Sequence, residues 1–480
     1  MGGTFFGVEI ARRGLGAARQ AIHVTGHNLA NAATPGYSRQ EPVFTPTAPY
    51  APPTMQRPVR PLQMGTGVQV ETVRRVRDEF LDLQVRLAAA EKGYREAERA
   101  ALEQVEALFP EPGDYGIQAA LTKFWDAWQE LAENPTNLGV RAAVVGAGEQ
   151  LAALFRRTRA GLVALQKELA GDPEAGTVAD TGTRLAAAAE EASRILSELA
   201  TLNREIVRVR SMEGASPNDL LDRRDLLLDR LGALGPISWE ENGPAAGVVS
   251  VDLFGVRVLD GTRALEEDSV LTIDAAWLEE NYGAWLAGGG AAEQTGRVGG
   301  LLAAYDTVGR IVASLDALAA ALAGAVNDLH RQGYTLSGAA GGDFFAAAAR
   351  ADELAVVPEL TANPSLVAAA AAPAPGDGEQ ARAIAGLRRT ALAALGGLTA
   401  DAAYQQLVGT LGAARRTAAD QEQAVGLWAR QAGAFREAVK GVSVEEELTR
   451  LAQYQYQYQA AARFLAVLDE CLDTLVNRLR

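Results

Sequence analysis

The sequence predicts a mainly α-helical protein, α+β overall. Its terminal helices pair as a coiled coil, its body is an elongated helical bundle, and a small antiparallel β unit is inserted. Three observations favour this class. Hydrophobic residues make up 48% of the chain but aromatic residues only 6%, so the apolar content depends on alanine, a strong helix former that buries little area. Both ends carry apolar residues at alternating three- and four-residue steps, as in helices that pack on helices. One central segment alternates with the period of two that is typical of strands.

The two terminal helices are expected because their apolar residues repeat in seams. In the N-terminal helix the large seam residues are Val8, Leu15, Ile22 and Leu29. In the C-terminal helix the seam consists of Leu448, Leu451, Tyr458, Leu465, Leu472 and Leu479. Ser443, followed three residues later by Glu446, is a capping box that predicts the start of this helix. Arginine predominates in the first 40 residues and acidic residues in the C-terminal helix, so we expect the two helices to pair.

Between these helices the sequence pattern changes several times. Residues 42–61 are rich in proline and threonine, which predicts an extended, loop-like segment, and residues 67–73 alternate like a strand. Helical signals dominate residues 78–230. Residues 236–273 alternate with a period of two and contain Asn-Gly and Asp-Gly turn signals, which predicts a short antiparallel β unit. Helix is expected to return near residue 300.

These patterns divide the chain into three nested parts, the number expected for 480 residues at roughly 150 residues per domain. Residues 1–45 with residues 441–480 are expected to form a terminal coiled-coil domain. Residues 46–235 with residues 300–440 are expected to form the helical body. Residues 236–299 are expected to form the small inserted β unit.

Composition excludes several classes of protein. The formal net charge of −15 repels phosphate backbones, so we expect no nucleic-acid binding. A single cysteine, Cys471, excludes an intramolecular disulfide and a Cys-rich zinc site, and we expect it to be a small buried residue. No secretory leader is visible, because apolar residues precede the basic ones at the N-terminus. Prolines interrupt the longest uncharged stretch, so we expect no membrane insertion.

No motif for catalysis, cofactor binding or metal binding stands out. His23 and His27 are four residues apart, but a third ligand is missing nearby, so a polar helix face is the better interpretation. The aromatic cluster of Phe124, Trp125 and Trp128 is more typical of core packing than of a ligand platform. We therefore expect a protein that is not an enzyme and has no cofactor.

The segment from residue 27 to residue 40, HNLANAATPGYSRQ, resembles the N-terminal signature of bacterial flagellar rod, hook and hook-associated proteins. The signature residues are Asn28, Leu29, Ala30, Asn31, Thr34, Pro35, Gly36, Tyr37 and Ser38. Physically, the helix seam ends here and the chain is expected to continue extended from Tyr37. Residues 451–480, LAQYQYQYQAAARFLAVLDECLDTLVNRLR, resemble the closing helix of the same axial family. Both motifs lie at the appropriate ends of one chain, which makes the resemblance specific.

Internal segments narrow the resemblance to the FlgK family, the hook-associated proteins of the hook–filament junction. They are residues 67–86, 121–137, 216–231, 327–333 and 341–345. Simple rod and hook proteins resemble this chain only at its ends. Larger FlgK-like proteins carry a substantial β domain after the Phe-Phe pair, whereas Ala-rich helical sequence soon follows Phe345 here. The chain therefore resembles a compact variant with a reduced outer domain.

The resemblance implies a structural, non-catalytic component of the bacterial flagellum that joins hook to filament and is needed for filament assembly. It implies type III export from the cytoplasm to an extracellular position. The implied partners are further copies of the chain in a ring, hook protein on one side, and a second junction protein and flagellin on the other.

The family's terminal helices are typically disordered in the free monomer. This agrees with seams that contain Thr25, Gln455 and Asp469, which are too polar to associate strongly alone. The family also uses a small cytosolic export chaperone that holds the C-terminal helix. The candidate chaperone contacts here are Leu451, Tyr454, Tyr458 and Leu465.

Three other interpretations remain. A rod or hook subunit of the same axial family is the alternative, and the internal matches argue against it. An enzyme would need a catalytic insertion, but the predicted β unit has no histidine or cysteine, and no paired-acid motif beyond scattered Asp and Glu. An adhesin-like binding module would need a long exposed β insertion, and the reduced outer domain argues against one.

Overall fold

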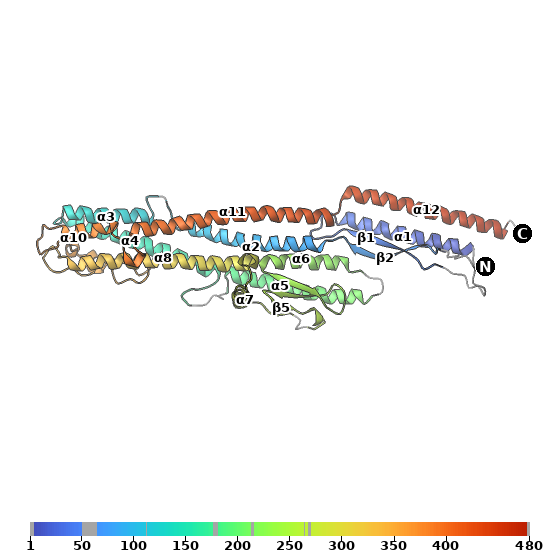
Figure 1. Ribbon diagram of the computed structural model, residues 1–480, viewed down its shortest axis with the longest axis horizontal. Coiled ribbons are helices and arrows are strands. Elements are labelled where there is room, and N and C mark those ends of the chain that lie inside the picture. Colours follow the sequence, from blue (N-terminus) through green and yellow to red (C-terminus); the bar gives the residue numbers. More distant parts are fainter. Residues whose placement is uncertain are drawn as a thin grey trace. The chain divides into compact units, whose positions relative to one another are not determined.

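The computed structural model describes residues 4–49, 65–111, 113–175, 181–212, 216–263, 265–266 and 270–477 (Figure 1). The chain folds into two compact units. Unit 1 comprises Met1–Ala89, Arg194–Thr272 and Leu427–Arg480, and unit 2 comprises Ala90–Ser193 and Ile273–Gly426. Helices predominate, and the described strands form two small antiparallel sheets. This confirms the predicted mainly α class with a small β component.

Unit 1 contains both terminal helices and both sheets. Its elements are α1 (Thr4–Ala30), β1 (Gln40–Pro46), β2 (Val68–Arg75), the first turns of α2 (Glu79–Ala107), the second part of α5 (Arg184–Arg210), α6 (Asn218–Leu234), β3 (Ile237–Glu241), β4 (Val249–Leu253), β5 (Val256–Leu259), η1 (Gly261–Arg263), the last turns of α11 (Ala400–Lys440) and α12 (Val444–Asn477). The three-part division expected from the sequence stays a prediction.

Helices α1 and α12 lie side by side and run antiparallel, so the start of α1 is next to the end of α12 (Figure 1). A Cβ atom added at Gly7 would lie 3.0 Å from Leu468 Cδ1, and one added at Gly14 would lie 3.7 Å from Ala461 Cβ. Seven residues forward on α1 thus correspond to seven residues backward on α12. This is the heptad spacing of a coiled coil, and the predicted pairing of the terminal helices is confirmed.

One of the two rows of the predicted α1 seam, that of the large residues, differs by one residue from the contact face, whereas the other row, with Ala11, Ala18 and Thr25, lies on it. The buried side chains of α1 that continue the heptad between Gly7 and Gly14 and onward are Ala11, Ala18, Ala21, Thr25 and Asn28. The larger predicted residues, Val8, Leu15, Ile22 and Leu29, are only half-buried. The separation of two packed helices depends on the side chains at their contact. Small residues therefore occupy the centre of this close contact, and the larger ones lie along its flank.

Strands β1 and β2 pair antiparallel, from Gln40 opposite Arg75 to Pro46 opposite Val68, with an irregularity after Val43. The strand expected at residues 67–73 is confirmed, but the start of the segment expected to be loop-like is its partner strand. Proline lacks an N–H donor and is tolerated only on edge strands, and β1 is an edge strand of a two-stranded sheet. Residues 50–64, the rest of that segment, lie outside the described residues.

The predicted β unit is a three-stranded antiparallel sheet with the order β3–β4–β5. It is shorter than the expected span of residues 236–299, because α7 (Ala275–Ala287) begins inside that span. Asp274 caps this helix by accepting a hydrogen bond from the Trp277 backbone N–H at 2.8 Å. A side-chain cap of this kind starts a helix, and the sequence after it no longer alternates with a period of two.

Unit 2 is helical and has a large apolar core. It contains the remaining parts of α2, α5 and α11, with α3 (Ile117–Glu133), α4 (Leu138–Leu169), α7, α8 (Gly296–Gln332), α9 (Pro358–Ala362), α10 (Glu379–Gly386) and short 3-10 turns. Phe124, Trp125 and Trp128 of α3 are at most 1% exposed, and Phe344 and Phe345 pack against them. This confirms that the aromatic cluster belongs to the core.

Two helical segments, Leu138–Leu169 and Ala292–Gln332, are long and apolar enough to cross a membrane by length and composition alone. Both contribute fully buried residues to the core of unit 2, such as Leu162 and Leu315. A core helix in a water-soluble fold passes the same test, and core packing accounts for the apolar composition of both segments.

Two buried polar side chains of α8 organise the loop that follows it. Asn327 Oδ1 accepts hydrogen bonds from the backbone N–H groups of Phe344 and Phe345, both at 2.9 Å. His330 Nδ1 donates to the Gly342 carbonyl at 2.7 Å, and Nε2 accepts from the Ala368 N–H at 2.9 Å. These contacts require the neutral ring, and burial lowers the pKa of His330.

Candidate functional site

The strongest polar centre in unit 1 surrounds Asn28, at the C-terminal end of α1. Its side chain is 1% exposed. Asn28 Oδ1 accepts from the Tyr37 hydroxyl at 2.8 Å and from the Gln40 N–H at 3.0 Å. Asn28 Nδ2 donates to the Gln40 carbonyl at 2.9 Å and to Glu447 Oε2 of α12 at 3.0 Å. All four hydrogen-bonding positions of this amide are used, so one side chain joins α1, β1 and α12.

A tight turn brings Tyr37 back to Asn28. The Tyr37 N–H donates to the Thr34 carbonyl at 3.2 Å, and Gly36 has a φ of +84°, in the left-handed region that favours glycine. The Tyr37 side chain is buried, and its hydroxyl also lies 3.0 Å from His27 Nδ1. Burial, with the negative charges of Asp219 and other nearby acids, raises the pKa of Tyr37. The hydroxyl therefore stays protonated and can donate to Asn28.

The chain after the turn is held against the start of α6. Gln40 Nε2 donates to Asp219 Oδ1, and Asn218 Nδ2 donates to Gln40 Oε1, both at 3.0 Å. Asn218 Nδ2 also donates to the Val73 carbonyl of β2 at 2.8 Å. We call Asn28, Tyr37, Gln40, Asn218 and Glu447 the signature hub. It connects α1, β1, β2, α6 and α12 within unit 1.

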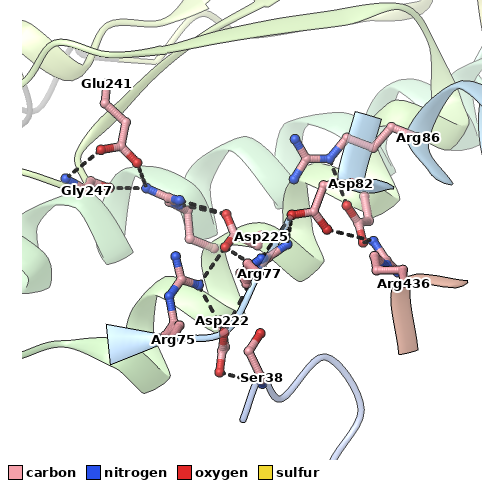
Figure 2. Close-up of polar contacts among 12 residues, drawn as sticks. Ser38, Arg75, Arg77, Asp82, Arg86, Asp222, Asp225, Glu241, Gly247 and Arg436 are labelled. Atoms are coloured by element: carbon pink, nitrogen blue, oxygen red, sulfur yellow. Dashed lines mark hydrogen bonds and ion pairs between the residues drawn. The ribbon is translucent and has the colours of Figure 1, made fainter. Parts of the chain in front are cut away.

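Next to the hub, arginines from β2 and the following loop pair with aspartates of α6 (Figure 2). Arg75 Nη1 lies 2.9 Å from Asp222 Oδ1 and 2.6 Å from Asp225 Oδ2. Arg77 pairs with Asp225, and its Nη2 lies 2.8 Å from Asp82 Oδ2. The Asp222 carboxylate also accepts from the Ser38 backbone N–H at 2.9 Å, which ties the network to the signature segment.

The network continues in two directions along α6. Arg86 Nε lies 2.8 Å from Asp229 Oδ1, and Arg436 of α11 lies 2.5 Å from Asp229 Oδ2 (Figure 2). At the other end, Arg224 binds Asp225 at 2.7 Å and Glu241 of β3 at 2.8 Å. The arginine–aspartate network, defined as Arg75, Arg77, Asp82, Arg86, Asp222, Arg224, Asp225, Asp229 and Arg436, is mostly buried. Breaking a buried pair by removing one partner is costly, so the network specifies how these elements meet.

The pKa values of Asp222 and Asp225, the two aspartates at the centre of the network, are shifted in opposite directions. Burial alone would raise the pKa of Asp225, but the charges of Arg224, Arg77 and Arg75 outweigh it and lower that pKa to about 2. Burial also acts on Asp222, where the Ser38 N–H and Arg75 offset it only in part, so its pKa is raised. Asp225 is therefore the charge on which the network depends most.

The joint between α11 and α12 lies against the signature segment. The Arg39 N–H donates to the Lys440 carbonyl at 2.8 Å, and Arg39 Nη1 lies 3.2 Å from Glu446. Ser443 Oγ accepts from the Glu446 N–H at 3.4 Å, so the predicted cap of α12 is confirmed. Arg450 Nη1 lies 3.2 Å from Glu41 of β1. The pair of Arg39 with Glu446 is of the predicted kind, an N-terminal arginine on an acid of the C-terminal helix, whereas the pair of Arg450 with Glu41 has the charges reversed.

The predicted residues of the C-terminal helix occupy different environments. Leu451, Tyr454, Leu465 and Leu472 are half-buried, and the Tyr454 ring lies 6.2 Å from that of Phe44 in β1. Leu448 and Tyr458 are 51% and 41% exposed, outside the contact with α1. Leu479 lies outside the described residues.

The residues of the N-terminal signature also differ in how deeply they are buried. Asn28, Tyr37 and Ser38 are buried, and Leu29, Asn31 and Gly36 are half-buried. Ala30, Thr34 and Pro35 are exposed. The buried members hold the turn to α6 and α12, while the exposed ones remain on the surface.

The hub partners Gln40, Asn218 and Glu447 and the arginine–aspartate network were not anticipated from the sequence. One signal was present, because Asn218, Asp222, Asp225 and Asp229 recur at four- and three-residue steps. Polar residues at heptad spacing indicate one polar face of a helix, and here that face is buried.

No arrangement for catalysis is visible in the described part of the chain. Within it, no group of three or more His, Cys, Asp or Glu side chains could hold a metal ion. Cys471, expected to be a small buried residue, is exposed on α12. The buried charges of unit 1 are paired with one another and join structural elements.

Comparison with known proteins identifies related sequences over nearly the whole chain. The family described as "Flagellar hook-associated protein FlgK helical domain" matches residues 102–345. The family described as "Flagellar basal body rod FlgEFG protein C-terminal" matches residues 439–479. Flagellar hook-associated protein 1 of Bacillus subtilis (strain 168) is 31% identical over an alignment 521 positions long, gaps included, that covers 99% of both chains.

Other relatives match more partially. Flagellar hook-associated protein 1 of Escherichia coli (strain K12) is 25% identical over 347 residues, covering 71% of this chain and 59% of that protein. A solved structure of the flagellar hook junction protein FlgK from Burkholderia pseudomallei has a TM-score of 0.58 at 15% identity. That match covers 75% of this chain and all of the other, and it shows a shared fold.

Proposed function

The chain belongs to the FlgK family of flagellar hook-associated proteins, and from this we infer that it is a structural, non-catalytic component at the hook–filament junction of the bacterial flagellum. It is exported to the flagellum, where it associates with other axial components. Junction position, ring formation and the cytoplasmic stage before export are parts of this proposal.

The observation that carries the proposal is the antiparallel α1–α12 pair with an incompletely covered apolar flank. Small residues fill its centre, while Val8, Leu15, Ile22 and Leu29 remain half-exposed along one side. On α12, Leu448, Tyr456, Phe464 and Val467 are 45–72% exposed. Exposed apolar surface of this extent favours a subunit that is completed by neighbours in an assembly.

We propose that these neighbours are further copies of the chain in a ring, with hook protein on one side and a second junction protein and flagellin on the other. The terminal domain, residues 1–45 with residues 441–480, is then disordered in the free monomer and becomes ordered as neighbouring subunits cover it. The polar seam residue Thr25 and the small residues around it support a weak pairing in isolation.

Before export, we propose that a small chaperone binds α12 through Leu451, Tyr454, Tyr458 and Leu465. A double substitution of Leu451→Asp with Leu465→Asp should weaken both chaperone binding and incorporation into flagella. The control is Gln459→Asp, an exposed position on the same helix. Chaperone affinity that is equal in the double variant and the control would remove the chaperone part of the proposal.

The test of function is a clean deletion of the gene, with electron microscopy of the cells and an assay of flagellin in the medium. Bare hooks together with unpolymerised flagellin in the medium are the expected result, restored by the wild-type gene. The rod or hook alternative, which the match at residues 439–479 keeps in view, predicts that hooks are absent as well. Normal filaments would contradict both.

A further inference from the structure

Unit 2 contains an open hollow of about 650 Å³ along one face of α8. None of its lining residues belongs to the signature hub or to the arginine–aspartate network. Three tyrosines line it: Tyr94 of α2, Tyr282 of α7 and Tyr305 of α8. Asp306 and Arg310 of α8 also line it. Tyrosines from three helices thus face one space together with an acidic side chain.

The tyrosine hydroxyls have unused hydrogen-bonding capacity. Tyr94 is only 7% exposed, yet its hydroxyl has no hydrogen bond to any residue that the structure describes. The hydroxyls of Tyr282 and Tyr305 likewise have no hydrogen-bond partner among the described residues. None of the three hydroxyls is among the solvent-shielded polar atoms of the described residues, so each is accessible from the hollow and can form a hydrogen bond with a polar ligand there.

The acidic side chain of the hollow has no ion-pair partner in direct contact. Asp306, and Glu279 one turn before Tyr282 on α7, form no ion pair within 4 Å in the described part of the chain. Burial raises the pKa of both carboxyl groups, and the charge of Asp306 further raises that of Glu279. Arg310 donates instead to Thr307 Oγ1 at 3.0 Å. Arg310 lines the same hollow and lowers the pKa of Asp306 from a distance, whereas Glu279 lies near Asp306 without lining the hollow. Asp306 therefore faces the space without an ion-pair partner in contact.

We propose that this hollow binds an organic cation, a guanidinium or ammonium group, held by Asp306 and the surrounding tyrosines and attracted by the nearby charge of Glu279. Tyrosine faces attract such cations, as Arg95 already shows with its guanidinium 5.1 Å from the Tyr94 ring centroid. Carboxylates bind guanidinium groups with charge-assisted hydrogen bonds. An inorganic cation fits less well, because the described residues contain no group of three or more metal-binding side chains.

The cation has two possible sources with the same chemistry. One is an arginine or lysine side chain of a neighbouring axial protein, an assignment that rests on the proposed function. The other is a free polyamine or similar small cation, which does not depend on that function. Binding of the cationic group itself is measured on the full-length chain in either case.

The binding test is calorimetric titration of the full-length protein with arginine amide, with uncharged norleucine amide as the matched ligand. We expect the double variant Glu279→Gln with Asp306→Asn to bind arginine amide about tenfold or more weakly than wild type. Asp328→Asn is the control, since Asp328 is an exposed acid on α8 that pairs with Arg331 at 3.2 Å. Equal binding by wild type and the double variant, or equal binding of the two amides, would overturn the proposal.

A second measurement distinguishes the sources. A photoreactive residue in place of Thr307, which lines the hollow, is introduced in flagellated cells. An adduct with another axial protein identifies a side chain as the cation. Arginine amide binding without an adduct assigns a free organic cation. The deletion phenotype is scored separately, so failure of the binding test leaves the junction function unaffected, and the reverse also holds.

Discussion

Asn28 Nδ2 donates to Glu447 Oε2 across 3.0 Å, although the two residues are 419 positions apart in the chain. The Glu447 side chain is 1% exposed, and Arg450 Nη1 lies 3.3 Å from its other oxygen. The contact therefore joins the end of α1 to the beginning of α12 through a buried, charge-assisted hydrogen bond. This contact fixes the position of the α1–α12 pair relative to the other elements of unit 1.

The first prediction concerns this amide. Asn28→Ala should lower the free energy that protects the Gln40 backbone N–H by about 2 kcal/mol, because the buried partners of Asn28 lose their hydrogen bonds. Hydrogen exchange of that N–H is measured in the full-length protein in its assembled form, where the terminal domain is ordered. His23→Ala, an exposed change on the same helix, should leave its exchange rate unchanged. Unaltered protection in Asn28→Ala would show that the hub does not depend on this residue.

The second prediction tests the register of the terminal pair. A Cβ at Gly14 lies 3.7 Å from Ala461 Cβ, close to the mean Cβ separation of about 3.8 Å in disulfides. Gly14→Cys with Ala461→Cys, in a Cys471→Ser background, should form a disulfide under mild oxidation of assembled flagella, in which the terminal domain is ordered. Mobility on a non-reducing gel reports it. Gly16→Cys with Ala461→Cys is the control, since nothing lies within 4 Å of a Cβ there; efficient cross-linking of the control pair would exclude this register.

The third prediction concerns Asp225, which contacts three arginines. Asp225→Asn should lower the free energy of unfolding of unit 1 by about 3 kcal/mol at pH 6, because buried arginines lose their partner. Glu198→Gln, which removes an exposed ion pair with Arg223, should cost less than about 1 kcal/mol. Urea denaturation at pH 6 provides the comparison, and equal costs for the two substitutions would contradict the prediction.

The stability difference between wild type and Asp225→Asn should also depend on pH, because the pKa of Asp225 is lowered in the folded protein. The folded pKa of Asp225, about 2, lies below its ordinary value of 3.8, so the ionised group stabilises the fold above pH 3.8. That contribution is about 2 kcal/mol and is lost as the pH falls from 3.8 towards 2. The stability difference between wild type and Asp225→Asn should therefore shrink over this interval. A difference that stays constant down to pH 2 would rule out Asp225 as its source.

The fourth prediction concerns His330 in unit 2. Burial lowers its pKa below the ordinary 6.5, so the unfolded chain takes up the proton first and the stability of unit 2 decreases as the pH falls below 6.5. Urea midpoints measured between pH 7.5 and pH 5.5 should fall for wild type. His330→Gln should be destabilised at pH 7.5 but should lose part of this pH dependence. His23→Gln, at an exposed position, should retain it.

The sequence was sufficient where local pattern decides the structure. The terminal helices, the Ser443 cap and the burial of Trp128 follow from residue spacing and short-range hydrogen bonding. The phase of the α1 seam could not be obtained in this way, because apolar periodicity selects Leu15 whereas the close contact with α12 selects Gly14.

The arginine–aspartate network shows a different limit. Arg75 and Asp225 are 150 positions apart, and nothing local to either residue identifies the other. The charged residues of the network can be seen in the sequence, but charged residues on a predicted helix are usually solvated. The polar stripe of α6 was the one local sign that its charges are buried, and it became meaningful only once β2 and α11 were placed against it.

The antiparallel arrangement of α1 and α12 also constrains the order of folding. The helix that emerges first has as its partner the helix that is made last, so their contacts have nearly the greatest possible sequence separation in this chain. Contacts of such high contact order form late, after local structure has already formed. A chain that has only partly emerged from a ribosome or a secretion channel therefore presents α1 without its intramolecular partner until the final residues arrive.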